Sequence, residues 1–472
     1  MAVSWCPWRL RKEGSCYAQG ASDACCVVRF RSQRPGDRAL HVLLMINADG
    51  GLVPPAVLLG GSMTTGVLTA PGPAGDRFIG NLGDFSASPL EFLTECVRTY
   101  GDVVMLGSHN VLLAHPDDIE RVLVDRDSAF VKTTNKTLLH TRKQGFPGAM
   151  MNSDGEDWHA KRRRLSPAFT RRMVDAAALV AREEADRAFA SWRGGQTVEP
   201  DHDLSVLTLR TITRLMFGDA IGQADIDTIG RLVAVIMDFS EQQIMLPQWF
   251  PTPRGLRLRR SLREIDELLT RIMRTAPADS PVLEVLRGSG LSDSDVQDEL
   301  ATLLLAGFET SKNAITWACH LLAGHPDVAD RVAADPSYAD RVVREVLRLY
   351  PTTWITSREA ARDVEFQGHH VPAGTTVTVC QWVTHRDERW FAGAAEFRPD
   401  RWEDGLAARG AYFPFGLGPR ACIGGAVATT EIVVAVSEIC RRFRLHAAGD
   451  VTVRPALALQ ARGARFRLEA RG

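Results

Sequence analysis

Apolar and polar residues follow a helical period over most of this chain and lose it near the start. From Pro89 onward, long segments with apolar residues every three to four positions alternate with short runs typical of strands. The segments predicted to be helices are 89–100, 156–165, 226–245, 256–273 and 294–323, and those predicted to be strands are 103–106, 111–114 and much of 364–380. We therefore predict one mainly α domain with a minor sheet.

The segment Ser294–Ala323 is the strongest helix signal in the sequence. Ser294 and Gln297 have the spacing of a capping box, and Gly324 with Pro326 ends the pattern. About 30 residues at ~1.5 Å each give a helix on the order of 45 Å long, enough to cross a large domain. Because its middle is apolar on most sides, we expect it to be buried.

The first 62 residues have almost no helical period and differ in composition from the rest. They include four of the cysteines and a Gly/Pro-rich stretch at 50–61, and Met63 follows directly. We interpret residues 1–62 as an atypical leader, disordered or arising from a misplaced start, and residues 63–472 as the functional domain. A genuine disordered or metal-binding leader is the alternative.

Composition excludes several classes of protein. The chain has 472 residues, a formal charge of -1, 45% hydrophobic and 24% charged residues, which is ordinary for a globular protein. No window reaches the ~18 to 20 apolar residues of a membrane helix, so we expect a soluble, cytoplasmic protein without a membrane anchor. The nine cysteines show no regular spacing, which argues against a disulfide scaffold or a zinc site.

The ten residues that end at Gly424 read F-x-x-G-x-R-x-C-x-G and present one sulfur, that of Cys422, to a flat cofactor. A thiolate ligand to iron favours cleavage of an O–O bond. Gly418 permits a tight turn, and Gly424 lets the following helix begin close to the cofactor. Arg420 supplies a permanent charge for a carboxylate, and Phe415 would shield the sulfur from water.

This loop resembles that of the cytochrome P-450 (haem-thiolate monooxygenase) family, of the soluble bacterial type. A rival reading, the dinucleotide fingerprint G-x-G-x-x-A starting at Gly416, fails because Pro419 interrupts the helix that this motif requires. The resemblance implies the cytochrome P-450 fold with a long central oxygen-binding helix. It also implies haem b as cofactor, with Cys422 as the axial thiolate ligand.

The predicted long helix contains Ala306-Gly-Phe-Glu-Thr-Ser in its middle. Gly307 in a helix interior costs about 1 kcal/mol relative to Ala, and a bare backbone there makes room for a ring and a diatomic ligand. The segment resembles the family's oxygen-binding helix, which implies that Thr310 and Glu309 relay protons to bound dioxygen. Ser311 stands where many relatives carry a second threonine.

A pair of opposite charges, Glu345 and Arg348, lies three residues apart on one predicted helical face. Such pairs are common on exposed helix surfaces. The downstream run Phe397–Trp402 resembles the family segment whose arginine joins this pair in a buried three-way network. By that resemblance Arg401 is the third member.

Three more positions match the family's contacts with the haem carboxylates. Trp158 and Arg162 lie one helical turn apart, and Arg358 follows the helix of the Glu/Arg pair. With Arg420, three arginines would serve two carboxylates.

Basic residues cluster at 161–164 and 171–172. The cluster fits either a solvated face or the docking of an acidic electron donor, since charge raises encounter rates. The run is short and lacks interleaved aromatic residues, so we do not expect nucleic acid binding.

The resemblance implies a monooxygenase that inserts one atom of dioxygen into a substrate, with electrons from a separate ferredoxin and ferredoxin reductase, because the chain leaves no room for a flavin reductase. A redox or gas-sensing haem-thiolate protein, or a peroxide-driven or isomerising relative, are alternatives. We expect a small, mostly apolar substrate of secondary metabolism, such as a terpenoid, polyketide or fatty acyl compound. Its contacts are expected in the loop 138–151 and around Ile244, Met245, Leu246 and Phe250.

Overall fold

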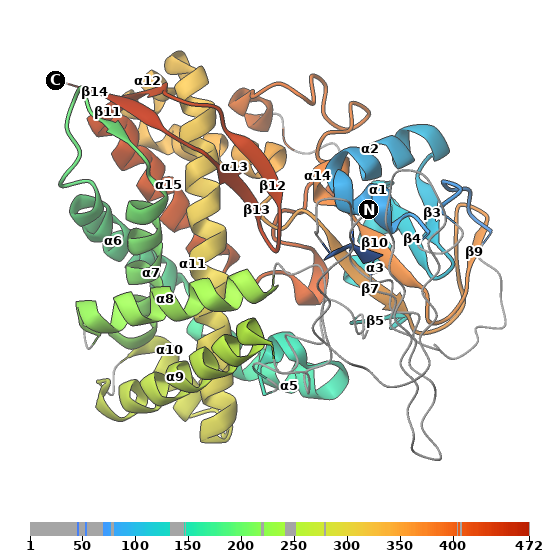
Figure 1. The fold of residues 1–472 in the computed structure, drawn as a ribbon, viewed down its shortest axis with the longest axis horizontal. Helices are drawn as coiled ribbons and strands as arrows, with labels where there is room; N and C mark the ends of the chain where they lie inside the picture. Colours follow the sequence, from blue (N-terminus) through green and yellow to red (C-terminus); the bar gives the residue numbers. More distant parts are fainter. Residues whose placement is uncertain are drawn as a thin grey trace, which may run out of the picture.

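Helix α11 (Asp293–Gly324) runs through the centre of the computed structural model, and the other elements are arranged around it (Figure 1). The predicted long helix is confirmed, but its cap is not the predicted one. The N-cap is Ser292, whose side chain accepts a hydrogen bond from the backbone N–H of Asp295. Ser294 lies inside the first turn, so the capping box begins two residues earlier than the pattern indicated.

The structure describes residues 45–46, 52–53, 69–76, 80–132, 146, 148–218, 221–240, 252–277, 280–403, 405 and 408–471. Met63, most of the leader, most of the loop 138–151 and the four apolar residues at 244–250 lie outside the described residues. Within the leader, β1 (Met45–Ile46) and β2 (Leu52–Val53) pair antiparallel.

Helices occupy most of one side of the molecule (Figure 1). Helix α7 packs against α11 and α6, and α15 packs against α6 and α11. The remaining bounds are α1 Leu82–Ala87, α2 Pro89–Tyr100, α3 Pro116–Val124, α5 Gly155–Leu165, α6 Arg171–Ala188, α7 Asp201–Phe217, α8 Gln223–Ser240, α9 Pro253–Thr275, α10 Pro281–Arg287, α12 Pro326–Ala334, α13 Ala339–Leu349, α14 Gln381–Thr384 and α15 Gly425–Arg442.

The main sheet lies on the other side and has five strands in the order β3-β4-β10-β7-β5. Strand β10 pairs parallel with β4 and antiparallel with β7, which brings Arg358 opposite Val377. The strand bounds are β3 Val103–Gly107, β4 Asn110–Leu113, β5 Phe130–Lys132, β6 Thr197–Val198, β7 Thr356–Ala360, β8 Val364–Phe366, β9 His369–Val371, β10 Thr376–Val379, β11 Phe443–Ala447, β12 Thr452–Pro455, β13 Leu459–Arg462 and β14 Phe466–Ala470.

The core is continuous around the second half of α11. Buried residues of α11, α12, α13 and α15 pack together there, and the ring of Trp317 stacks on that of Tyr350 with 3.9 Å between centroids. In the part of the chain that the structure describes, no helix is long and apolar enough to cross a bilayer. The core therefore fixes the helix that carries Thr310 against the helix that follows Cys422.

Candidate functional site

The loop that carries Cys422 is held against α3 by a glycine. Gly418 has a φ of +70°, and a Cβ there would lie 2.4 Å from the backbone oxygen of Leu123. Only glycine relieves both the strain and the clash. The backbone N–H of Cys422 donates to the carbonyl of Phe415 over 2.8 Å, which closes the loop.

The Cys422 side chain is accessible, although protein surrounds its sulfur. The side chain has exposed surface, yet burial raises the pKa of its thiol, against the opposing effects of the Gly424 backbone N–H and the Arg162 charge. The ring of Phe415 packs against the start of α15, because it lies 3.4 Å from the position that a Cβ on Gly425 would take.

Three arginines from distant parts of the chain lie near Cys422 or near one another. Arg162 lies close enough to Cys422 for their charges to interact. Burial, together with the nearby charge of Arg420, lowers the pKa of Arg358 to about 10. The guanidinium of Arg420 lies 4.2 Å from the ring centroid of the buried Trp158.

The three arginines have fewer carboxylate partners than charges, and this fits an anionic cofactor. Among the described residues, the one carboxylate that pairs with any of the three is Asp154, which binds Arg420. Desolvated guanidinium groups are most stable against carboxylates that they can hold by paired hydrogen bonds. A flat group with two carboxylates, beside a single sulfur ligand, matches this set of residues.

Helix α11 presents a small open face in its buried middle. Ala306 is exposed, and Leu303, Gly307 and Thr310 are partly exposed, although most residues around them are buried. The hydroxyl of Thr310 donates to the carbonyl of Ala306 over 2.8 Å. A Cβ on Gly307 would meet Ile212 of α7 at 3.1 Å, so the glycine here lets α7 approach α11.

Glu309 lies on a different face of α11 from Thr310. Its carboxylate pairs with Lys312 at 3.0 Å and accepts from the side-chain amide of Asn313 at 2.9 Å. Lys312 also pairs with Asp201, at the start of α7, over 3.1 Å. The acid predicted to relay protons is thus joined through one lysine to an exposed carboxylate.

Glu345, Arg348 and Arg401 come together as one buried network. Glu345 and Arg348 are fully buried and share two hydrogen bonds of 2.8 and 2.9 Å. The Nε of Arg401 donates to Glu345 over 2.9 Å. The segment that leads to the thiolate loop is therefore tied to α13.

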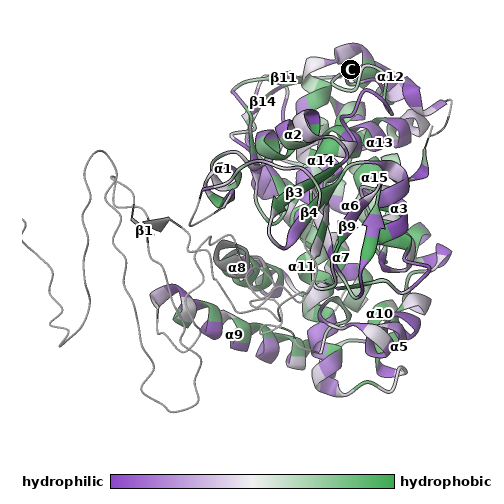
Figure 2. Cartoon of the chain, turned by 90° about the vertical axis from the view of Figure 1, so that its right-hand side faces the viewer, coloured by the Kyte–Doolittle hydropathy of each residue, from purple (hydrophilic) through white to green (hydrophobic). Residues whose placement is uncertain are grey.

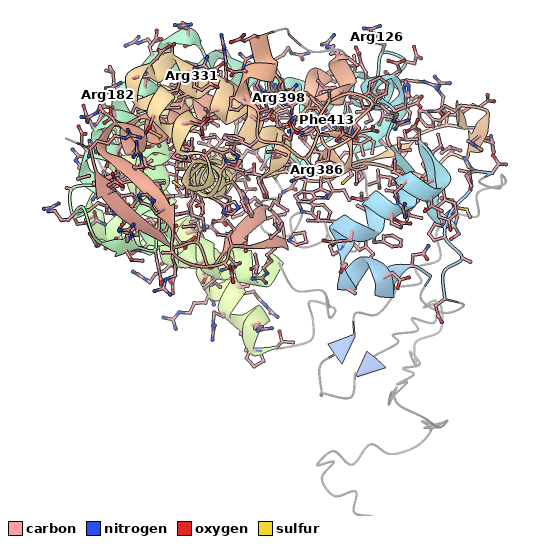
Figure 3. The ribbon with its side chains drawn as sticks, turned by 90° about the horizontal axis from the view of Figure 1, so that it is seen from above. Arg126, Arg182, Arg331, Arg386, Arg398 and Phe413 are labelled. Atoms are coloured by element: carbon pink, nitrogen blue, oxygen red, sulfur yellow. The ribbon has the colours of Figure 1, made fainter. Side chains whose placement is uncertain are left out.

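Asp154 and Lys312, which the sequence interpretation did not assign to the site, belong to it, as does His385, whose segment His385–Asp387 resembles a structural segment of the family. Asp154 caps α5 and binds Arg420, Lys312 holds Glu309, and the Nε2 of His385 accepts from the backbone N–H of Phe413 over 3.0 Å. Figure 3 labels Phe413, in the view that shows α11 end-on. Only Asp154 had a usable local signal, because an aspartate followed by Gly155 and two acidic residues is typical of a helix start.

Comparison with known proteins decides the family. The family model for cytochrome P-450 matches residues 70–464. The chain belongs to the cytochrome P-450 family. Cyclooctat-9-en-7-ol 5-monooxygenase of Streptomyces melanosporofaciens is 31% identical over 433 residues, 83% of this chain and 91% of the relative. Pentalenene oxygenase of Streptomyces avermitilis is 28% identical, covering 85% and 97% of the two chains.

Two cytochrome P-450 structures from Thermus thermophilus are similar in fold. Both are 27% identical to this chain, with TM-scores of 0.69 and 0.71, and cover 81% and 82% of it and 98% and 97% of the known structures. The predicted family and fold class are confirmed. The family carries haem with a cysteine thiolate as axial ligand, and the chain is a haem-dependent monooxygenase. The roles of the individual site residues stay predictions.

Proposed function

We propose that this cytochrome P-450 oxidises a small, mostly apolar terpenoid, with electrons from a separate ferredoxin and ferredoxin reductase in the cytoplasm. The observation that carries the proposal is the similarity, over more than four-fifths of the chain, to enzymes named for cyclooctat-9-en-7-ol and pentalenene. The small apolar face of α11 at Leu303, Ala306 and Gly307 supports an apolar substrate. The described cysteines are all free, which supports a reducing compartment.

In this proposal each side chain has one task. Haem, when bound, supplies the iron that activates dioxygen, and a thiolate ligand favours cleavage of the O–O bond. Cys422 provides that thiolate, and Trp158, Arg162, Arg358 and Arg420 bind and orient the carboxylates.

On α11, the Oγ1 of Thr310, which donates to the carbonyl of Ala306, would hold and pass a proton at the site where dioxygen is activated. Glu309 would carry protons toward Thr310 from the side of Lys312 and the exposed Asp201. Gly307 leaves α11 without a side chain at this point, because a Cβ there would contact Ile212 too closely. Dioxygen and the substrate would share the small open face beside these groups.

The basic cluster separates into two parts. Lys161 is buried and pairs with Asp157 at 2.9 Å, and Arg162 faces Cys422. Arg163, Arg164, Arg171 and Arg172 are exposed. These four exposed arginines form the surface on which we propose that the acidic ferredoxin docks, because complementary charge speeds encounter.

The test uses the purified holoenzyme with a surrogate ferredoxin, its reductase, NADPH and a panel of cyclic terpenes. We expect a spin-state shift on binding and an oxygenated product that depends on ferredoxin. Turnover with peroxide but not with ferredoxin would favour the peroxide-driven alternative. Binding of haem and gases without any product would favour the sensing alternative.

We further propose that residues 63–472 form the working unit and that the leader is dispensable. The family match over residues 70–464 lies inside this range. Intact-mass measurement of natively expressed protein tests the start, and a species that begins at Met1 would contradict a start at Met63.

A further inference from the structure

The first half of α9 is strongly basic. Residues 254–263 contain five arginines and no acidic residue, a formal charge of +5. Glu264, the first acid of the helix, pairs with Arg260 over 2.8 Å and offsets one of these charges. All five are exposed: Arg254, Arg257, Arg259, Arg260 and Arg263. We call these arginines and Leu256 the α9 basic patch.

An exposed leucine stands in the middle of the patch. Leu256 is 54% exposed, one of few large apolar residues so open in the described chain. Arg259, Arg260 and Arg263 follow it at i+3, i+4 and i+7, so they share its face of the helix. The opposite face is buried through Leu258, Ser261, Ile265, Leu268, Leu269 and Ile272.

The second half of α9 differs from the first. Exposed Asp266 and Glu267 lie among its cations, and Arg271 pairs with Asp225 of α8 over 2.6 Å. Figure 2 shows α9 extending at the edge of the molecule beside α8, with hydrophilic stretches along its length. The excess of positive charge is therefore confined to the first half, where the apolar side chain is also exposed.

We propose that the α9 basic patch docks on an anionic lipid surface. Arginines with an aliphatic residue between them match a bilayer interface, where guanidinium groups meet phosphates while their stems and the leucine enter the headgroup region. An acidic protein would satisfy the charge but gives no reason for a leucine at the centre. Nucleic acid would favour interleaved aromatic residues, which residues 254–263 lack.

Docking of this kind is peripheral and requires no spanning helix. It would hold the enzyme at the membrane, where apolar compounds partition, whatever the identity of the substrate. The inference rests on the charge and exposure of α9 and not on the proposed terpenoid or ferredoxin. Binding through the patch should be reversible, because salt screens the interaction.

The test is cosedimentation of the holoenzyme with vesicles at low and high salt. We expect binding to vesicles of phosphatidylcholine with about a third phosphatidylglycerol, and little binding to phosphatidylcholine alone. The variant Arg257→Gln/Arg263→Gln should bind about 25-fold more weakly, or about fivefold for each arginine. Leu256→Ser should bind about fivefold more weakly.

The matched control is Arg274→Gln/Arg462→Gln, which removes the same charge from exposed positions outside the patch. It should bind like the wild type, and all variants should keep the haem spectrum and the thermal midpoint. Absence of binding to anionic vesicles, equal binding to neutral vesicles, or equal losses in test and control variants would overturn the proposal. So would binding of a purified acidic acyl carrier protein through the patch without vesicle binding.

Discussion

Two buried glutamate networks lie on different helices, and they differ in how completely they are satisfied. Both begin with a glutamate and a cation three residues apart, Glu345 with Arg348 on α13 and Glu309 with Lys312 on α11. Each pair also binds a third charged residue from a distant part of the sequence. The local sequence pattern alone does not distinguish the two networks.

The network on α13 is saturated. Glu345 also accepts from the indole of Trp402 at 3.1 Å and from the backbone N–H of Arg398 at 3.0 Å. Arg348 uses its remaining donors on the carbonyls of His385, Ala394 and Glu396. A network without a spare donor or acceptor has one geometry, which suits the support of a metal ligand.

The network on α11 is open at one end. Lys312 is 10% exposed, but its second partner Asp201 is 73% exposed. An ammonium has rotatable donors and no fixed fork, so the lysine can change partners more easily than an arginine. The comparison teaches that the same i, i+3 pair can be closed by further partners or stay connected to solvent. For the connected pair we propose a route for protons.

The largest expected effect is at the saturated network. Glu345→Ala leaves Arg348 and Arg401 buried without their carboxylate and should cost about 3–5 kcal/mol of stability. We expect little haem per polypeptide after purification, together with a lowered thermal midpoint. Asp400→Asn is the control, because Asp400 and its partner Arg331 are about half exposed and should cost at most about 1 kcal/mol. Normal haem content in Glu345→Ala would show that the α13 network is not required to support the thiolate loop.

Breaking the open network should cost less. Lys312→Met leaves Glu309 without its cation, and we expect a loss of about 2–3 kcal/mol, because solvent near Asp201 can relax part of the cost. Asp201→Asn should cost under about 1 kcal/mol, because the residue is exposed. Chemical unfolding of the three proteins measures both values. A loss in Lys312→Met as large as in Glu345→Ala would show that the second network is closed too.

A third buried glutamate, Glu431, has no cation beside it among the described residues, and its pKa makes the stability of the protein depend on pH. Burial raises the pKa of Glu431 on α15 to about 8, against the opposing effect of the nearby hydroxyls of Ser311 and Thr211. No ion pair reaches it among the described residues. Its carboxyl is thus protonated in the folded chain from pH 4.5 to about 8 while the unfolded chain is ionised, so the free energy of unfolding falls as pH rises through this window.

Glu431→Gln should abolish that contribution. Between pH 5 and pH 8, the stability of the variant relative to the wild type should rise by on the order of 3 kcal/mol. Thermal midpoints of both proteins over this range provide the measurement, with Asp201→Asn as a control that should follow the wild type. Parallel curves for Glu431→Gln and the wild type would show that the carboxyl does not titrate in this window.

The smallest expected free-energy change is at the end of the proposed proton route. Thr310→Ala should lower the amount of product per NADPH about tenfold, while substrate binding is unchanged. Thr316→Ala is the matched control, because this threonine of α11 also donates to the carbonyl four residues earlier, over 2.9 Å. Equal coupling in Thr310→Ala and the wild type would place the proton route elsewhere.

Contiguous patterns were enough to predict several parts of the site. The helix at Pro89–Tyr100 has the predicted bounds, and the strands of 364–380 occur as β8, β9 and β10. Gly418 has the positive φ that a tight loop requires. These features depend on residues that are adjacent in the chain, so they can be predicted directly from the sequence. The capping box was wrong by two residues because Ser292 and Ser294 both precede a suitable partner, and only the path of the chain into α11 selects between them.

The sequence by itself determined the family motifs, the single sulfur ligand and the charges available to bind a cofactor. The tertiary structure decided which charges meet: Arg162, Arg358 and Arg420 converge from a helix, a strand and a loop, and Lys312 turns Glu309 toward Asp201. The physical reason is that burial and long-range ion pairing depend on how elements pack. No local period carries that information.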